Sequence, residues 1–357
     1  HEAPLATKKL ERIIEAGVAQ SCEADVPLGV LLSGGIDSTL VSYLAKKNGG
    51  QITNAFFLFT GKNDDELKIV ERIAEDISLK LNVVDINDRD FLHYLKNISK
   101  NSGEILTNVS FALNALLTKQ ANKKKIKVLL SGAGGDEIFF GYPPVNWFYI
   151  LNNYNPFIKL IRHPIGYVKE YGIEGYKEYY RKIMEENVIS RFDVAYVVDS
   201  EFDLSRTINV KGYVHPLKIH ALFSLLSLNS HSVVMAGDLG GMANSVEIRA
   251  PLLHYDIISN AFGYRTTDFL DFFTSKKVLK DMLKKTELSY VLNLKKTGFG
   301  HQMMLNQILE GMEDELKEAN EILHRLFPHL KISNTPKNKL MALQFKNIVD
   351  IIEYRSL

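Results

Sequence analysis

The chain has 357 residues, of which 46% are hydrophobic and 24% are charged, a composition typical of a globular protein of about two domains. Its 43 Lys and Arg residues nearly balance its 42 Asp and Glu residues, and the net charge of +1 argues against a dedicated nucleic-acid binder or a membrane-surface protein. One cysteine, Cys22, excludes an intrachain disulfide and a cysteine cage around a metal, and it favours a reducing, cytoplasmic compartment.

Short apolar runs alternate with longer amphipathic stretches in the first half of the chain. After a helix over 6–20, the pattern predicts strands at Leu28–Leu32, Ala55–Phe59, Leu81–Ile86 and Ile126–Leu130, with helices between them that include Asp37–Lys47 and about 64–80. This alternation predicts parallel strands with helices on both faces of the sheet. We therefore expect an α/β fold with a doubly wound parallel sheet in residues 1–150, completed by a mainly helical portion over 151–357.

The first motif with chemical content is Ser33-Gly34-Gly35-Ile36-Asp37-Ser38, where a predicted strand ends and a helix begins. Ligands of open parallel sheets bind at the carboxyl ends of the strands. The glycines let the backbone approach a phosphate closely, the helix N-terminus offers N–H groups, and Ser33 and Ser38 add hydroxyl donors. The motif predicts a phosphate cradle that is neither a Walker A loop nor a dinucleotide fingerprint. The alternative is a strand–turn–helix with a Ser or Asp cap.

A second glycine-rich turn, Ser131–Glu137, follows another predicted strand. If the two turns lie at the same edge of the sheet, the carboxylates of Asp37 and Asp136 converge. Such a pair is the usual way to hold Mg²⁺ on a polyphosphate. Alternatively, Asp136 and Glu137 cap the helix that follows.

Two later segments are ambiguous when each is taken alone. Glu247 and Arg249 lie two residues apart and could form a surface ion pair worth less than ~1 kcal/mol. Lys296, which precedes Thr297 and Gly298, could lie against phosphates.

These four segments, in this order, resemble the synthetase domain of the asparagine synthetase family, whose relatives include β-lactam synthetases, carbapenam synthetase and lasso-peptide cyclases. The matching blocks are Val26–Ser38, Ser131–Tyr142, Met242–Leu253 and Lys296–Phe299, and the resemblance covers roughly residues 6–300. It implies a PP-loop ATP-pyrophosphatase fold that uses ATP and Mg²⁺. It also implies a two-step reaction in which a carboxylate attacks the α-phosphate of ATP, and an amine then displaces AMP to form an amide.

The resemblance assigns roles to individual positions. The ATP-binding positions that it implies are Leu31, Ser33, Gly34, Gly35, Asp37, Ser38, Phe57, Ser131 and Gly132, and the substrate-binding positions are Gly135 and Arg249. Asp37 and Asp136 match the Mg²⁺ ligands. Lys296 matches a lysine that stabilises the second transition state, and Glu247 matches a glutamate that acts as a base.

The chain departs from the family pattern in two places. Ala133 stands where asparagine synthetases have an acidic residue and β-lactam-forming relatives have a tyrosine, which argues against free ammonia and aspartate and leaves room for a bulkier amine. Residue 1 is His1, whereas glutamine-using members begin with a nucleophilic cysteine, and we interpret Cys22 as a small, half-buried hydrophobic residue. The chain is therefore predicted to contain no glutaminase nucleophile. Three alternatives stay open: a separate or removed glutaminase domain that supplies ammonia, a degenerate domain before His1, or no such domain in the natural protein.

The predicted function is that of an ATP-dependent, AMP-forming amide ligase, with asparagine synthesis the commonest activity of the family. Lasso-peptide cyclisation, β-lactam-type closure and amidation of a sugar uronate are alternatives within the same chemistry. A PP-loop tRNA-modifying enzyme and a non-catalytic scaffold are alternatives of other classes. The partners expected are a small-molecule or peptide carboxylate and an amine donor, without nucleic acid or membrane, and the resemblance allows a homodimer.

Overall fold

The chain divides into two compact units, each assembled from separated segments. The computed structural model describes residues 5–48, 51–59, 64–86, 88–103, 105, 109–141, 218, 221, 225, 233–271, 274–294, 309, 312–329 and 336–355. Unit 1 comprises His1–Gly17, Ala133–His231 and Leu252–Lys285, and unit 2 comprises Val18–Gly132, Ser232–Pro251 and Thr286–Leu357. The expected boundary at residue 150 lies outside the described residues and stays a prediction.

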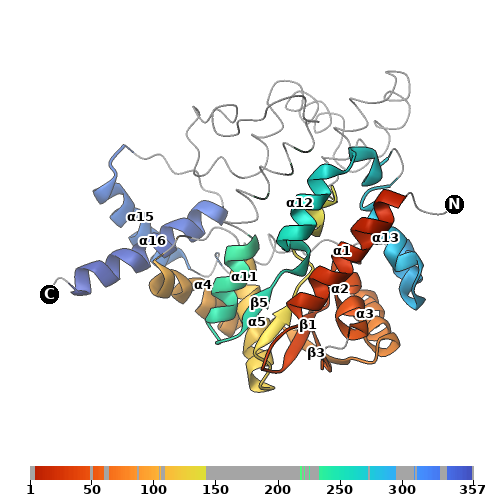
Figure 1. Ribbon diagram of the computed structural model, residues 1–357. Coiled ribbons are helices and arrows are strands. Elements are labelled where there is room, and N and C mark those ends of the chain that lie inside the picture. The colour runs from red at the N-terminus through yellow and green to blue at the C-terminus, as the bar shows by residue number, and fades with distance from the viewer. Residues whose placement is uncertain are drawn as a thin grey trace. The chain divides into compact units, whose positions relative to one another are not determined.

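Unit 2 is built on a sheet of five parallel strands in the order β3-β2-β1-β4-β5 (Figure 1). The strands are β1 (Leu28–Leu31), β2 (Asn54–Phe59), β3 (Lys80–Asp85), β4 (Val128–Leu130) and β5 (Glu247–Arg249). The chain runs outward from β1 to β3 and then returns to place β4 on the other side of β1. The sheet is therefore doubly wound with its switch point between β1 and β4, which confirms the predicted fold class.

Helices make up most of the remaining described structure. Unit 2 contains α2 (Ile36–Lys47), α3 (Asp64–Asp76), α4 (Asp88–Ser102), α5 (Ser110–Lys123), α11 (Met235–Met242), α15 (Glu313–Leu326), α16 (Pro336–Arg355) and a 3₁₀ segment at Glu287–Asn293. Unit 1 contains α6 (Gly135–Ile138), α12 (Tyr255–Gly263), α13 (Lys277–Lys284) and a 3₁₀ turn at Thr266–Asp268, while α1 (Leu5–Ser21) and the turn Pro251–Leu253 cross the division. None of the helices in the described part of the chain combines the length and apolarity needed to cross a membrane.

Helix α3 and strand β4 differ most from the bounds that the hydrophobic periodicity predicts. Helix α3 stops at Asp76, short of the predicted residue 80, because Ser78 adopts a left-handed φ of 52° and Leu79 N–H donates to Ala74 O. Strand β4 starts at Val128, after a left-handed Lys125 with φ 61°. Left-handed residues of this kind end helices without a glycine to mark them in the sequence.

Both faces of the sheet are covered, which explains why β1, β2 and β4 are largely apolar. On one face, Phe56, Leu58 and Leu129 join a buried cluster with side chains from α4, α5, α11, α15 and α16. On the other face, α2 packs on β1, and α3 packs on β2 and β3 (Figure 1). Because side chains alternate between the two faces along a strand, Phe57 of β2 faces the side opposite to Phe56 and Leu58. It is buried, with 2% of its surface exposed.

Helices α5 and α11 lie in close contact because Gly240 of α11 leaves room for the backbone of α5. Thr118 Oγ1 donates to Gly240 O at 2.8 Å, and Asn244 Nδ2 donates to Ala115 O at 2.9 Å. Tyr94 on α4 donates its hydroxyl to Asn244 Oδ1 at 2.9 Å. These bonds fix the segment that leads directly into β5.

Replacing Gly240 by alanine is expected to destabilise the protein by about 1–3 kcal/mol through overpacking. A Cβ at this position would collide with Phe111 O and lie 2.7 Å from Asn114 Cβ. In Gly237→Ala, on the same helix, the new Cβ would lie 3.7 Å from Ile248 Cγ2, an ordinary contact, so this control should lose no stability. Urea unfolding of both variants measures the difference, and equal midpoints would show that the seam tolerates a side chain.

Candidate functional site

The loop between β1 and α2 is folded around the hydroxyl of Ser38. Ser33 N–H donates to Ser38 Oγ at 3.2 Å, and Ser38 Oγ donates to Gly35 O at 3.2 Å. The 2.9 Å bond between the two hydroxyls then has Ser33 Oγ as its donor, because the only hydroxyl proton of Ser38 is already used. Gly34 adopts φ 73°, a conformation that favours glycine. Ser38 therefore holds the loop together from inside, while Ser33 is exposed.

The loop after β4 packs directly against the start of α2. Ser131 N–H donates to Arg249 O at 2.8 Å and Ser131 Oγ donates to the same carbonyl at 3.1 Å, so the end of β4 is tied to β5. A Cβ on Gly132 would lie 2.5 Å from Ser38 N and 2.8 Å from the Asp37 carbonyl carbon. Because that space exists only for a glycine, the backbones of the two loops meet at the switch point. We call residues 33–38 and 131–132 the cradle.

The cradle has the features that a bound polyphosphate requires. It lies at the carboxyl ends of β1 and β4, on either side of the switch point, where ligands of such sheets bind. The first turn of α2 contributes backbone N–H groups, the partial positive charge of a helix N-terminus, and the half-buried carboxylate of Asp37. Leu31 is the half-buried last residue of β1 and Phe57 is buried in β2. Their contact with adenosine stays a prediction.

Asp136 lies in unit 1, in the first turn of α6. Gly134 before it has φ 93°, and a Cβ there would lie 2.5 Å from Leu253 Cδ2, so the turn requires a glycine. Gly135, a predicted substrate-binding position, is buried as the first residue of α6. Asp37 belongs to unit 2, so the convergence of the two carboxylates stays a prediction.

The fit to Mg²⁺ follows from the chemistry of the donors. Within the described residues, no group of three or more His, Cys, Asp and Glu side chains is placed to hold a metal ion. Mg²⁺ usually takes one or two carboxylates and completes its shell with water and substrate phosphate oxygens. Asp37, within the cradle, meets that requirement, with Asp136 as the second predicted ligand.

Glu247 and Arg249 form the ion pair that their spacing suggested. Arg249 Nε lies 2.9 Å from Glu247 Oε1, and Arg249 Nη2 donates to Oε2 at 3.2 Å. Arg249 Nη1 also donates to the backbone oxygens of Ser21 and Glu23 at 3.0 and 2.8 Å. Four of the five guanidinium N–H donors are therefore occupied, and these contacts favour a structural role at the end of α1 over substrate binding.

The structure does not bring Glu247 to the cradle. Glu247 is in register with Val128, and Val128 with Leu28, which places it at the amino end of the sheet. Its side chain is exposed and is engaged by Arg249. The role of catalytic base stays a prediction that these contacts do not support.

Replacing Arg249 by methionine is expected to lower the free energy of unfolding by about 2 kcal/mol, since two carbonyls at the end of α1 lose a charged donor. The matched control is Arg265→Met, because Arg265 is 81% exposed and pairs with Asp268 at 3.5 Å. That change should cost less than about 1 kcal/mol. Thermal unfolding and a turnover assay decide between the two roles. An Arg249→Met variant that keeps the stability of the wild type but does not turn over substrate would support the substrate-binding role of Arg249.

With the geometry described, comparison with known proteins decides the family. The model of the asparagine synthase family matches residues 9–344. The chain belongs to the asparagine synthase family.

The chain is only distantly similar to the individual known proteins that it matches. Asparagine synthetase [glutamine-hydrolyzing] 1 of Bacillus subtilis is 25% identical over 349 residues, covering 87% of this chain and 52% of that protein. Amidase chry2 of Gibberella zeae is 29% identical over 148 residues, covering 37% of this chain and 22% of that protein. The solved NH3-dependent NAD synthetase of Campylobacter jejuni is 21% identical, covers 38% of this chain and 59% of its own, and superposes with a TM-score of only 0.26, which supports no argument. The chain spans about half the length, or less, of the curated relatives it matches.

Cys22 is half-buried, as predicted, directly after α1. Burial raises the pKa of its thiol, and the nearby Arg249 charge offsets this only in part. A thiol of raised pKa is a poor nucleophile at neutral pH. This position is therefore unsuited to the glutaminase chemistry of glutamine-using family members.

Of the two lysines Lys276 and Lys296, the structure describes only Lys276. Lys296, the predicted catalytic lysine, lies outside the described residues. Lys276 was not predicted as a site residue, yet its Nζ lies 2.6 Å from Asp136 Oδ1. The sequence contains no signal that separates Lys276 from the other lysines of the same run, which are Lys277, Lys280, Lys284 and Lys285.

Proposed function

We propose that the chain is an ATP-dependent, AMP-forming amide ligase that adenylates a carboxylate and then transfers the acyl group to ammonia or an amine. The observation that carries this proposal is the cradle, in which Gly132 packs on the first turn of α2 at the switch point of a doubly wound sheet. Membership of the asparagine synthase family supports the same chemistry.

In the first step, the carboxylate oxygen of the substrate attacks the α-phosphorus of ATP, and the bond from that phosphorus to the bridging oxygen of pyrophosphate breaks. Negative charge grows on the leaving pyrophosphate. The N–H groups of the first turn of α2 would stabilise that charge, while the hydroxyls of Ser33 and Ser38 keep the loop in shape. Mg²⁺, when bound by Asp37 and Asp136, supplies further neutralisation of phosphate charge.

In the second step, the amine nitrogen attacks the acyl carbon, the acyl–phosphate oxygen bond breaks, AMP leaves and the nitrogen loses a proton. A cation is required where the tetrahedral oxyanion forms. The family resemblance assigns this task to Lys296. The base that takes the proton is not identified by the described contacts, because Glu247 is paired with Arg249 away from the cradle.

The identity of the substrates depends on Ala133. This half-buried residue follows Gly132 in the loop, and its methyl group neither accepts a proton nor orients an amine. It favours a second candidate of the same chemistry, a specialised amide-former that takes a bulkier amine, such as a peptide α-amine, over asparagine formation. A glutaminase partner, a homodimer and a cytoplasmic location stay predictions.

The test is product analysis with ATP, Mg²⁺ and defined pairs of acid and amine. We expect AMP, pyrophosphate and amide in equal amounts for one pair among aspartate with ammonia, a uronate with ammonia, and a peptide that carries both groups. ADP and inorganic phosphate as the products would contradict the proposal.

The variant Ala133→Glu separates the two candidates. If the wild type makes AMP from aspartate and ammonia, asparagine formation is the activity and Ala133 is no obstacle. If only Ala133→Glu does so, or if the wild type uses only a bulkier amine, the specialised amide-former is supported.

A further inference from the structure

Asp136 is held by a buried ion pair that connects the second glycine-rich turn to the start of α13. Lys276 Nζ lies 2.6 Å from Asp136 Oδ1, with 8% of the lysine side chain and 24% of the aspartate side chain exposed. Lys276 N–H also donates to Phe139 O at 3.2 Å, next to the edge-on ring contact of Phe139 with Phe269. The lysine is therefore shielded from water, while the aspartate stays partly exposed.

The backbone is bent on both sides to make this contact. Lys276 has φ 54° and Phe140 has φ 57°, left-handed values that are uncommon for residues with a side chain. Gly141 N–H donates to Asp136 O at 2.8 Å, and a Cβ on Gly141 would collide with both Asp136 Oδ1 and Lys276 Cε. The ion pair is therefore accompanied by two left-handed residues, Lys276 and Phe140, and by one glycine, Gly141, at a position with no room for a side chain.

General stability does not explain such an arrangement. A buried ion pair seldom stabilises a protein more than apolar side chains of the same volume would, because both charges lose their hydration. Strained backbone persists where the surrounding structure holds it in place, and it clusters at functional sites. The cost is better explained by a need to hold the Asp136 carboxylate in one orientation.

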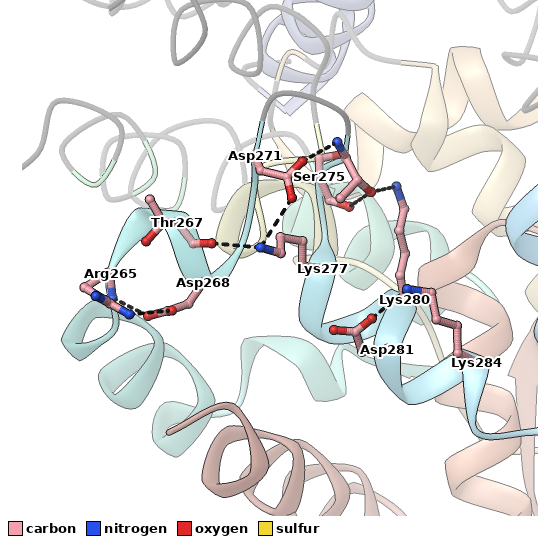
Figure 2. Close-up of polar contacts among 10 residues, drawn as sticks. Arg265, Thr267, Asp268, Asp271, Ser275, Lys277, Lys280, Asp281 and Lys284 are labelled. Atoms are coloured by element: carbon pink, nitrogen blue, oxygen red, sulfur yellow. Dashed lines mark hydrogen bonds and ion pairs between the residues drawn. The ribbon is translucent and has the colours of Figure 1, made fainter. Parts of the chain in front are cut away.

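The neighbouring lysines are engaged elsewhere. Lys277 pairs with Asp271 at 3.3 Å and Lys284 with Asp281 at 2.8 Å (Figure 2). Lys280 Nζ donates to Thr274 Oγ1 at 2.7 Å. Burial, followed by the charge of Lys276, lowers the pKa of Lys280. Lys280 is thus a half-buried lysine on the same helix that bonds to a neutral hydroxyl, which makes it a matched control.

We propose that Lys276 is a positioning residue that holds the Asp136 carboxylate ready for the Mg²⁺ that accompanies the nucleotide. The inference rests on the proposed function, since it takes Asp136 as a ligand of that ion. Carboxylate ligands of metals are themselves held by hydrogen bonds, and loss of such a partner typically costs about 10–100-fold in metal affinity or activity. Lys276 acts through Asp136 and does not touch the metal.

The experiment is a Mg²⁺ titration of nucleotide binding by the full chain, followed by calorimetry with a non-hydrolysable ATP analogue. Lys276→Met is expected to raise the half-saturating Mg²⁺ concentration by about 10–100-fold. Binding of the analogue without Mg²⁺ should be unchanged. Lys280→Met should bind with the Mg²⁺ dependence of the wild type.

Two further variants keep the test decisive if Lys276→Met fails to fold. Lys276→Arg retains the charge and should show a smaller rise in the Mg²⁺ requirement. Gly141→Ala retains both charges but pushes against the pair, and it should raise the requirement in the same direction. A folded Gly141→Ala variant with the Mg²⁺ dependence of the wild type would overturn the inference.

A double variant shows whether Lys276 acts through Asp136. Lys276→Met should add nothing to the loss caused by Asp136→Asn, and independent, additive losses would overturn the inference. Failure of the proposed function looks different, because the wild type itself would then bind no nucleotide at any Mg²⁺ concentration, or would release ADP and inorganic phosphate instead of AMP and pyrophosphate.

Discussion

Replacing Gly132 by alanine is expected to weaken ATP binding about 100-fold while the sheet remains folded. The added Cβ would lie 2.5 Å from Ser38 N and 2.8 Å from the carbonyl carbon of Asp37, and neither backbone atom can rotate away as a side chain could. Ser131 ties the end of β4 to Arg249 O, so the displacement falls on the first turn of α2. A distortion worth about 3 kcal/mol corresponds to about 100-fold in Kd.

Calorimetric titration with ATP and Mg²⁺ measures this effect, and circular dichroism checks the fold. The control is Gly263→Ala at the end of α12, where a Cβ would meet no atom within 4 Å. ATP binding by Gly132→Ala equal to that of the control would show that the nucleotide does not use the cradle.

The strands and loops that form the cradle could be predicted because each has a local signal. The strands β1 and β2 are apolar runs of the expected length, and the glycines that follow β1 end its run abruptly. Strand β5 gave no such signal, since it is the tripeptide Glu247–Arg249 with a charge at either end. It becomes a strand only because β4 offers it a free edge in the correct register.

The contacts that complete the site could not be predicted, because they join residues far apart in the sequence. Glu247 and Arg249 are near neighbours, so their ion pair was evident. The bonds from Arg249 to the end of α1 depend on tertiary structure. The contact of Gly132 with α2 depends on strand order, which hydrophobic periodicity does not reveal.

The contact of Lys276 with Asp136 could not be predicted from the sequence either. This pairing depends on a left-handed backbone that no sequence rule assigns to a lysine. The family resemblance predicts Asp136 as a Mg²⁺ ligand, but it does not indicate which residue holds the Asp136 carboxylate in place. The positioning residue therefore emerges only from the structure.

Replacing Asp37 by asparagine is expected to raise the Mg²⁺ requirement of nucleotide binding by more than about 100-fold, beyond the cost typical of outer-shell partners. Asparagine keeps the shape of the side chain but removes the charge that Mg²⁺ prefers. Asp37 also lies in the first turn of α2, where a carboxylate stabilises the helix dipole. That role alone is worth about 0.3–1 kcal/mol, so the stability of Asp37→Asn should change little.

Measuring both the Mg²⁺ requirement and the stability of Asp37→Asn separates the metal-binding role of Asp37 from its role at the helix N-terminus. The control is Asp256→Asn, which removes an exposed first-turn carboxylate from α12 and should show only the small loss of stability. Urea unfolding gives the stability, and the Mg²⁺ titration gives the binding. If Asp37→Asn loses stability like Asp256→Asn but keeps the Mg²⁺ dependence of the wild type, Asp37 is a helix-terminal acid and not a metal ligand. A large rise in the Mg²⁺ requirement at nearly constant stability is the result that only a metal ligand within the cradle would produce.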